Sequence, residues 1–189
     1  MNEEEVIKGC CDGDRRSQNA LYKRYFPLMS SIALRYYPNQ DEAMHGLNFG
    51  FLKVLQNIEN YNQQFALATW IRKILVNHFI DEFRKNNKYI STIHLKESDE
   101  ELIEYNAADL EMDADSLRAM LSNLPTVTGK VFNLFAIDGF KHKEISTMLK
   151  INEGTSKWHV SEARKLLKES ILKEVDLEKK RTDKQTAAG

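Results

Sequence analysis

The sequence predicts an all-α protein made of two small helical domains. Only 8 Gly and 3 Pro occur among its 189 residues, so the residues that most often end helices are sparse. Apolar side chains recur every three or four positions over long stretches, which is the helical period, and a hydrophobic content of 42% is enough for packed cores. A strongly acidic segment lies between two such stretches. We therefore expect one helical domain on each side of a linker.

The charge distribution gives the expected boundaries. Residues 91–116 carry nine acidic side chains and one lysine, whereas residues 1–90 and 117–189 have net charges of +2 and +5. Such a density of like charge repels itself and cannot be buried, so we interpret residues 91–116 as an exposed linker. The predicted domains are residues 1–90 and 117–175. Residues 176–189 are polar and lack periodicity, which predicts a disordered tail.

Composition and motifs argue against several classes of protein. Cys10 and Cys11 are the only cysteines, and adjacent cysteines disfavour an ordinary disulfide, so we expect a reduced, cytoplasmic protein. No apolar run approaches the roughly 18 residues of a membrane span, and the start of the sequence is too polar for a secretory signal. Five histidines show no metal-binding spacing, and no Gly-rich phosphate loop is present. We expect no cofactor, metal, membrane insertion or enzymatic activity.

The first block contains four expected helices. Their apolar positions recur at helical spacing over residues 2–11, 15–37, 40–57 and 67–85. Pro27 is expected to kink the second of them. The third directs Leu47, Phe51 and Val54 to one side, and Phe49 stands on the opposite, polar side. A phenyl ring in that position contacts another element of the domain or a partner.

The helix expected at residues 67–85 is the most apolar of this block, yet it has a polar stripe. The members of the stripe are three or four residues apart and therefore align along one side: Trp70, Lys73, Asn77, Asp81 and Arg84. The stripe suggests recognition of a ligand, and the alternative is that Asp81 only pairs with Arg84 or Lys85. The loop before this helix has aromatic and amide groups that suit unpaired bases, from Tyr61 to Phe65.

The second block ends in a predicted helix-turn-helix. Apolar residues at 117–124 and a support helix at 128–137 precede it, and Asn152 is placed to cap its second helix. On that second helix Ser156, Val160 and Ala163 share the inner side, and Trp158 is expected in solvent among cations. Such a helix suits a DNA major groove. An ordinary amphipathic helical hairpin is the alternative interpretation.

Four stretches, taken in order, resemble a bacterial sigma factor of the sigma-70 family, of the extracytoplasmic-function (ECF) kind. FLKVL, at residues 51–55, resembles the end of region 2.2. WIRKILVNHFIDEFRK, at residues 70–85, keeps the W-(I/L)-x-x-I-x-x-N-x-x-x-D-x-x-R-K pattern of regions 2.3 and 2.4. LSNLPTVTGKVFNL, from residue 121, resembles region 4.1, and the segment from residue 139 to 167 resembles region 4.2.

The resemblance implies a promoter-specificity subunit of core RNA polymerase without catalysis of its own. It implies contacts with the promoter minus-10 element by Tyr61, Asn62, Phe65, Trp70, Lys73, Asn77, Asp81, Arg84 and Lys85. It implies contacts with the minus-35 element by Thr155, Ser156, Lys157, Trp158, His159, Glu162, Arg164, Lys165 and Lys168. It implies docking on core polymerase by Asp41, Glu42, His45, Asn48, Phe49, Leu52 and Lys53. An anti-sigma factor is a further implied partner.

A stand-alone helix-turn-helix regulator is the competing interpretation. In such a protein residues 1–90 would sense a ligand or form a dimer. The aligned stripe from Trp70 to Arg84 beside a basic helix end distinguishes the two, because a ligand-sensing domain has no need of it.

Overall fold

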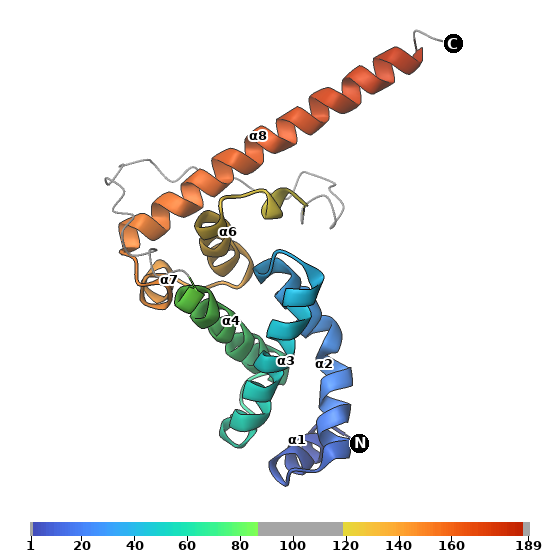
Figure 1. Cartoon of the computed structure of the whole chain (residues 1–189), viewed down its shortest axis with the longest axis vertical. Helices are drawn as coiled ribbons and strands as arrows, with labels where there is room; N and C mark the ends of the chain where they lie inside the picture. Colours follow the sequence, from blue (N-terminus) through green and yellow to red (C-terminus); the bar gives the residue numbers. More distant parts are fainter. Residues whose placement is uncertain (1, 87–118, 187–189) are drawn as a thin grey trace. The chain divides into compact units, whose positions relative to one another are not determined.

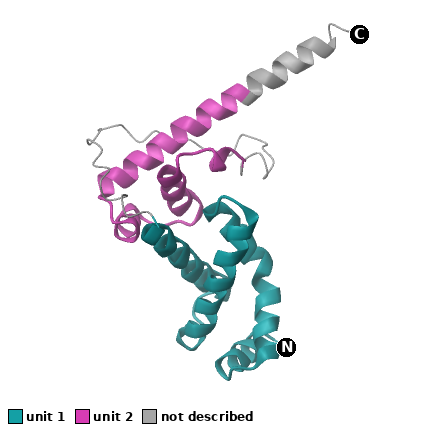
Figure 2. Ribbon diagram, in the orientation of Figure 1, with its two compact units in different colours: residues 1–88 teal, residues 89–189 magenta. Residues whose placement is uncertain are grey.

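The computed structural model describes residues 2–86 and 119–186, with side chains up to residue 173, and these residues form helices and turns without a strand. The chain divides into two compact units, Met1–Lys88 and Tyr89–Gly189 (Figure 2). The predicted all-α fold with two helical domains is confirmed. The predicted linker, residues 91–116, lies outside the described residues, so its boundaries stay a prediction.

Unit 1 contains four helices that pack on one another (Figure 1). They are α1 (Glu3–Cys11), α2 (Arg15–Tyr36), α3 (Gln40–Asn57) and α4 (Leu67–Asn86), with a short 3-10 helix, η1 (Ile58–Asn60), after α3. Helix α2 packs against α1, α3 and α4, and α3 packs against α4. The four expected helices are confirmed, each to within one residue at either end. Pro27 lies inside α2, which continues through it.

Polar side chains fix the starts of these helices. Asn2 accepts a hydrogen bond from the backbone N–H of Glu5 at 2.8 Å, and the Glu5 carboxylate accepts one from the Asn2 N–H at 2.9 Å. Asp14 accepts hydrogen bonds from the backbone N–H of Ser17 at 2.9 Å and from its hydroxyl at 2.7 Å. Asn39 caps α3 in the same way. Each cap satisfies backbone amides that a first helical turn leaves without partners.

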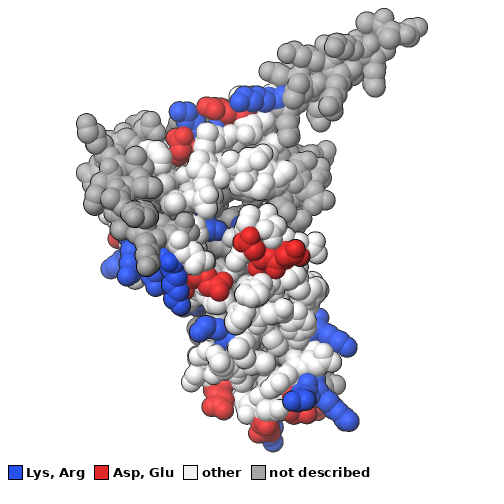
Figure 3. Space-filling view, in the orientation of Figure 1, with Lys and Arg blue, Asp and Glu red and all other residues white. Residues whose placement is uncertain are grey.

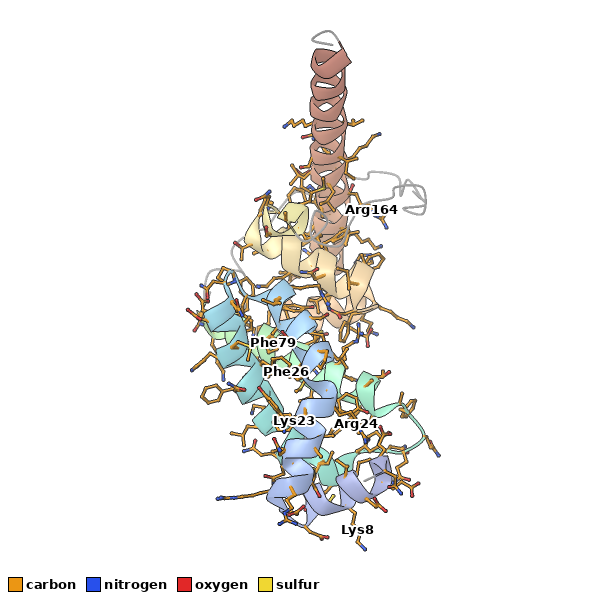
Figure 4. The ribbon with its side chains drawn as sticks, turned by 90° about the vertical axis from the view of Figure 1, so that its right-hand side faces the viewer. Lys8, Lys23, Arg24, Phe26, Phe79 and Arg164 are labelled. Atoms are coloured by element: carbon orange, nitrogen blue, oxygen red, sulfur yellow. The ribbon has the colours of Figure 1, made fainter. Side chains whose placement is uncertain are left out.

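Two glycines let α3 approach its neighbours closely. A Cβ atom at Gly46 would lie 2.3 Å from the ring of Tyr37, and one at Gly50 would lie 2.4 Å from a methyl group of Leu75 on α4. Because no side chain intervenes, α3 buries Leu47 completely, and Phe79 of α4 packs in the same core at 2% exposure (Figure 4). The predicted inward side of α3 is confirmed.

Unit 2 is built around the long helix α8. A helical turn at residues 119–122 precedes α6 (Thr126–Phe132), a π-helical turn η4 (Asn133–Ile137), α7 (His142–Leu149) and α8 (Glu153–Thr186). Helices α6 and α7 both pack against α8. A buried cluster of Met120, Leu124, Ala163 and Leu167 joins the first turn to α8. The expected end of the support helix is confirmed, since Gly139 follows it with a φ of +76°.

The end of the chain differs from the prediction. Helix α8 continues through residue 176 to Thr186, so the predicted disordered tail is wrong for residues 176–186, and residues 187–189 lie outside the described residues. The reason is composition: Glu, Lys, Leu and Arg dominate this segment and neither Gly nor Pro interrupts it after Gly154. Strong helix propensity therefore extends the helix without the apolar periodicity that the prediction required.

Candidate nucleic-acid interfaces

The stripe on α4 alternates between exposed and half-buried side chains. Lys73 and Asp81 are exposed, and Trp70, Asn77 and Arg84 are half-buried. The Asp81 carboxylate lies 2.8 Å from the Arg84 guanidinium, so these two residues do pair, while recognition by the stripe stays a prediction. An ion pair this exposed contributes at most about 1 kcal/mol to stability. Arg84 can therefore exchange this contact for a phosphate, and Asp81 for a hydrogen-bond donor on a base, at little cost.

The loop before α4 forms a compact turn that presents one aromatic ring. The Tyr61 hydroxyl donates a hydrogen bond to the Phe65 carbonyl at 2.5 Å, and the Asn62 side chain accepts one from the backbone N–H of Gln64 at 3.0 Å. The ring centroids of Tyr61 and Trp70 lie 5.4 Å apart. Phe65 is 64% exposed at the tip. The loop and the start of α4 thus form one continuous surface with an aromatic ring free to stack.

On α8 three of the predicted DNA contacts have buried side chains. Thr155, Ser156 and His159 are 5%, 0% and 4% exposed, and the side chains of Ser156 and His159 contact α7 and α6. The reason is the helical rotation of 100° per residue, which puts positions 155 and 159 within the arc centred on buried Ala163. Burial argues against a side-chain contact with DNA at these three residues, and the contacts themselves stay a prediction.

The remaining predicted contacts on α8 lie outside the buried arc. Lys157, Arg164, Lys165 and Lys168 are exposed (Arg164 is labelled in Figure 4). Glu162 and Trp158 are half-buried. Trp158 was expected in solvent, but its ring packs edge-on against His159 with centroids 4.9 Å apart.

Two hydrogen bonds, one buried and one partly buried, hold the start of α8. The Nδ1 atom of His159 lies 3.0 Å from the Thr128 hydroxyl on α6, and the Nδ1 atom of His142 on α7 lies 3.0 Å from the Ser156 hydroxyl. The His142 ring also stacks on Phe135, with centroids 4.4 Å apart. Burial lowers the pKa of both histidines, and nearby Lys157 lowers that of His142 further. Both rings are therefore kept neutral near pH 7.

One residue on the exposed side of α8 was not among the predicted contacts. Ser161 is half-buried and lies four residues after Lys157 and three before Arg164, so the three side chains follow one another along the helix. This spacing is visible in the sequence. The same spacing puts Ser161 on the side of the helix that carries Trp158 and Glu162.

The outer side of α3 agrees with the expectation for a docking surface. Its predicted contacts are all exposed: Asp41, Glu42, His45, Asn48, Phe49, Leu52 and Lys53. Phe49 and Leu52 are each 48% exposed, and the rings of His45 and Phe49 lie 4.8 Å apart. The expectation that Phe49 points away from the core is confirmed. The patch formed by Phe49 and Leu52 is apolar and bordered by polar side chains, as at many protein interfaces.

Charge is mixed on the visible face of both units in Figure 3. On the face shown in Figure 3, Lys and Arg appear beside Asp and Glu in each unit, so no field of one sign covers it. Within residues 2–86 and 119–173, no group of three metal-binding side chains occurs. None of the helices that the structure describes is long and apolar enough to span a bilayer.

Comparisons with known proteins agree in both units. Residues 21–89 match the family model for sigma-70 region 2, and residues 114–167 match that for sigma-70 region 4. The chain is 29% identical over 146 residues to the RNA polymerase sigma factor SigV of Bacillus subtilis, covering 76% of this chain and 84% of that protein. It is 21% identical over 187 residues to the ECF RNA polymerase sigma-E factor of Haemophilus influenzae, covering 90% and 96%.

A solved structure has a similar fold. It is that of the sigma factor RpoE from Bartonella quintana, determined in complex with the anti-sigma factor NepR. The likeness has a TM-score of 0.50 at 20% sequence identity and covers 80% of this chain and 94% of that one.

Proposed function

The chain belongs to the sigma-70 family of RNA polymerase sigma factors, in its ECF subfamily, and we propose that it directs core RNA polymerase to promoters with two DNA-binding surfaces, one on each unit. The observation that carries this proposal is the order of the two matches, with region 2 in unit 1 and region 4 in unit 2. The stand-alone regulator is not favoured, because region 2 occupies the part that would have to sense a ligand or dimerise.

The minus-10 surface is formed by the loop at residues 61–65 and the stripe on α4. Phe65 stacks on an unpaired base, and Asn62 hydrogen bonds to base edges, because stacking and amide contacts suit melted DNA. Lys73, Asn77 and the Asp81–Arg84 pair line the path of the strand. Trp70 supports Tyr61 through ring packing, and Lys85 supplies a phosphate contact at the basic end of α4.

The minus-35 surface is the exposed side of α8 in its first turns. Lys157, Ser161 and Glu162 are the residues within reach of base edges, with Trp158 at the border of this surface. Exposed Arg164, Lys165 and Lys168 bind phosphates and fix the position of the helix without reading sequence.

Core polymerase binds the exposed side of α3. The apolar patch of Phe49 and Leu52 supplies buried contact area, and Asp41, Glu42 and Lys53 around it supply charge complementarity. We place the protein in the cytoplasm because core polymerase works there, and we assign it no enzymatic activity.

An anti-sigma factor is the remaining proposed partner. The supporting observation is that the solved structure with a similar fold, RpoE from Bartonella quintana, is a complex with the anti-sigma factor NepR. An anti-sigma factor that covers either DNA-binding surface or the Phe49–Leu52 patch would keep the protein inactive.

Selection from a promoter library tests the proposed function. Core polymerase is reconstituted with the full chain and transcribes templates in which both promoter elements are randomised, and the transcripts are sequenced. We expect two enriched motifs at a fixed spacing, and none with core polymerase alone. Enrichment of a single palindromic site bound by the chain without polymerase would instead support the stand-alone regulator.

A further inference from the structure

The start of α8 contains more buried polar groups than helix packing requires. Ser156 and His159 lie beside apolar Val160 and Ala163, and all four are at most 4% exposed. Apolar residues at positions 156 and 159 would bury the same area without a need for partners. A buried polar group lowers stability unless it is hydrogen bonded, so such residues persist where their directionality is useful.

Each of the two polar groups bonds to a different helix. Ser156 bonds to His142 on α7, and His159 bonds to Thr128 on α6, at 3.0 Å in both cases. The His142 ring is itself fixed by its stack on Phe135 of η4. The first two turns of α8 are thus attached on both sides by groups three residues apart.

These contacts constrain a motion that apolar packing leaves open. Apolar contacts have no preferred direction, so Val160 and Ala163 tolerate small rotations of α8 about its axis. A hydrogen bond weakens steeply when its angle falls below about 120°. Rotation of α8 about its own axis, by the angle between consecutive residues, would separate the partners of both hydroxyl–imidazole contacts. It would also turn Lys157 and Ser161 away from their present direction.

We propose that Thr128–His159 and His142–Ser156 are positioning pairs that set the rotation of α8 and thereby determine which side chains read the minus-35 element. This inference rests on the proposed reading of DNA by α8. None of the four residues touches DNA. Their effect is on sequence preference, because a base contact made at the wrong angle loses its discrimination while phosphate contacts by flexible lysines persist.

Removing one hydroxyl tests the proposal. Thr128→Val keeps the shape of the side chain and deletes the bond to His159. The variant is assayed as the full chain bound to core polymerase, with a promoter library randomised at the minus-35 element. We expect the ratio of transcription from the best sequence to that from the average sequence to fall about tenfold. This is the discrimination that one base contact typically provides. Affinity for core polymerase should stay unchanged, and Thr128→Ser, which restores the hydroxyl, should restore the preference.

A control variant separates the loss of a positioning hydrogen bond from the loss of a threonine hydroxyl in general. The Thr147 hydroxyl donates only within its own helix, to the Lys143 carbonyl at 3.1 Å, so Thr147→Val should leave the preference unchanged. Circular dichroism establishes that each variant is folded at the assay temperature. If Thr128→Val is unfolded, Ser156→Ala is scored by the same criterion.

The possible outcomes are distinct. A folded Thr128→Val variant that keeps its full preference, or that weakens all sequences equally, would overturn the positioning role while leaving the proposed function intact. A wild-type chain that shows no minus-35 preference on core polymerase would overturn the proposed function itself.

Discussion

Two exposed phenylalanines of unit 1 lie in different surroundings. Phe49 is 48% exposed on α3 beside the equally exposed Leu52, so the two form an apolar patch on a rigid helix. Phe65 is 64% exposed on a loop whose shape depends on the hydrogen bond from Tyr61. A patch on a helix suits a protein partner, and a single ring on a loop suits a base.

The same substitution at these two positions should therefore have different effects. Phe49→Ala is expected to lower affinity for core polymerase about tenfold or more, as truncation of an aromatic interface residue often does. Phe65→Ala should leave that affinity unchanged and reduce promoter opening. Competition against another sigma factor measures the first effect, and permanganate reactivity of melted thymines measures the second. Equal effects of both variants on both measurements would contradict the separation of the two surfaces.

Two histidines, buried His159 and half-buried His142, make the stability of unit 2 sensitive to pH. Burial lowers the pKa of His142 and His159 in the folded state, whereas an unfolded histidine titrates near about 6.5. The unfolded state therefore binds more protons below about pH 6.5. The contribution of these two histidines to the free energy of unfolding should be constant above that pH and decline as the pH falls from about 6.5 toward the folded-state pKa values.

Urea unfolding followed by the fluorescence of Trp158 measures this decline, in a Trp70→Phe background that leaves one reporter. A double variant, His142→Asn and His159→Asn, keeps a polar atom near each Nδ1 position and should flatten the decline between about pH 6.5 and 5.5. An equally steep decline in the double variant would assign the effect to other groups.

At the scale of the helices, replacing glycine by alanine should have opposite effects on stability at two positions. Tight packing against a neighbour decides the effect at one position, and helix propensity decides it at the other. A Cβ atom at Gly46 of α3 would lie 2.3 Å from the Tyr37 ring, whereas one at Gly129 of α6 would be 3.5 Å from Leu124, an ordinary contact. Gly46→Ala should therefore destabilise unit 1 by about 1–3 kcal/mol through overpacking. Gly129→Ala should stabilise unit 2 by up to about 1 kcal/mol through helix propensity. Thermal unfolding of both variants tests this, and a stabilising Gly46→Ala would contradict the packing.

The sequence predicted helices better than it predicted which side of α8 is exposed. Helix positions follow from local signals such as the caps at Asn2, Asp14 and Asn39, which are legible in the chain itself. The outer side of α3 was also predictable, because its apolar side is unambiguous. On α8 the inner side contains Thr155 and His159, and the hydrogen-bond partner of His159 comes from a helix 31 residues away in the sequence. Polar residues buried by tertiary contacts cannot be recognised from helical spacing alone.

For the whole chain, mixed charge predicts weak binding of free protein to duplex promoter DNA. The net charge is -1, and residues 91–116 alone contribute -8, which repels phosphates. We expect mobility shifts with the free protein only at dissociation constants in the non-specific range, about 10⁻⁴ to 10⁻⁶ M at physiological salt. Addition of core polymerase should give tight, sequence-specific binding. Specific binding by the free protein at nanomolar concentration would instead support the interpretation as a stand-alone regulator.

The division into two units has a consequence for synthesis on the ribosome. Unit 1 ends at Lys88, and its helices pack mainly on neighbours in sequence, so its folding involves short loops and is expected within milliseconds. Translation of residues 89–189, at about 5–20 residues per second, takes at least about 5 s. Unit 1 is therefore folded on the ribosome, with its Phe49–Leu52 patch formed, seconds before α8 exists. A nascent chain could in this way meet core polymerase or an inhibitor before it is able to read a minus-35 element.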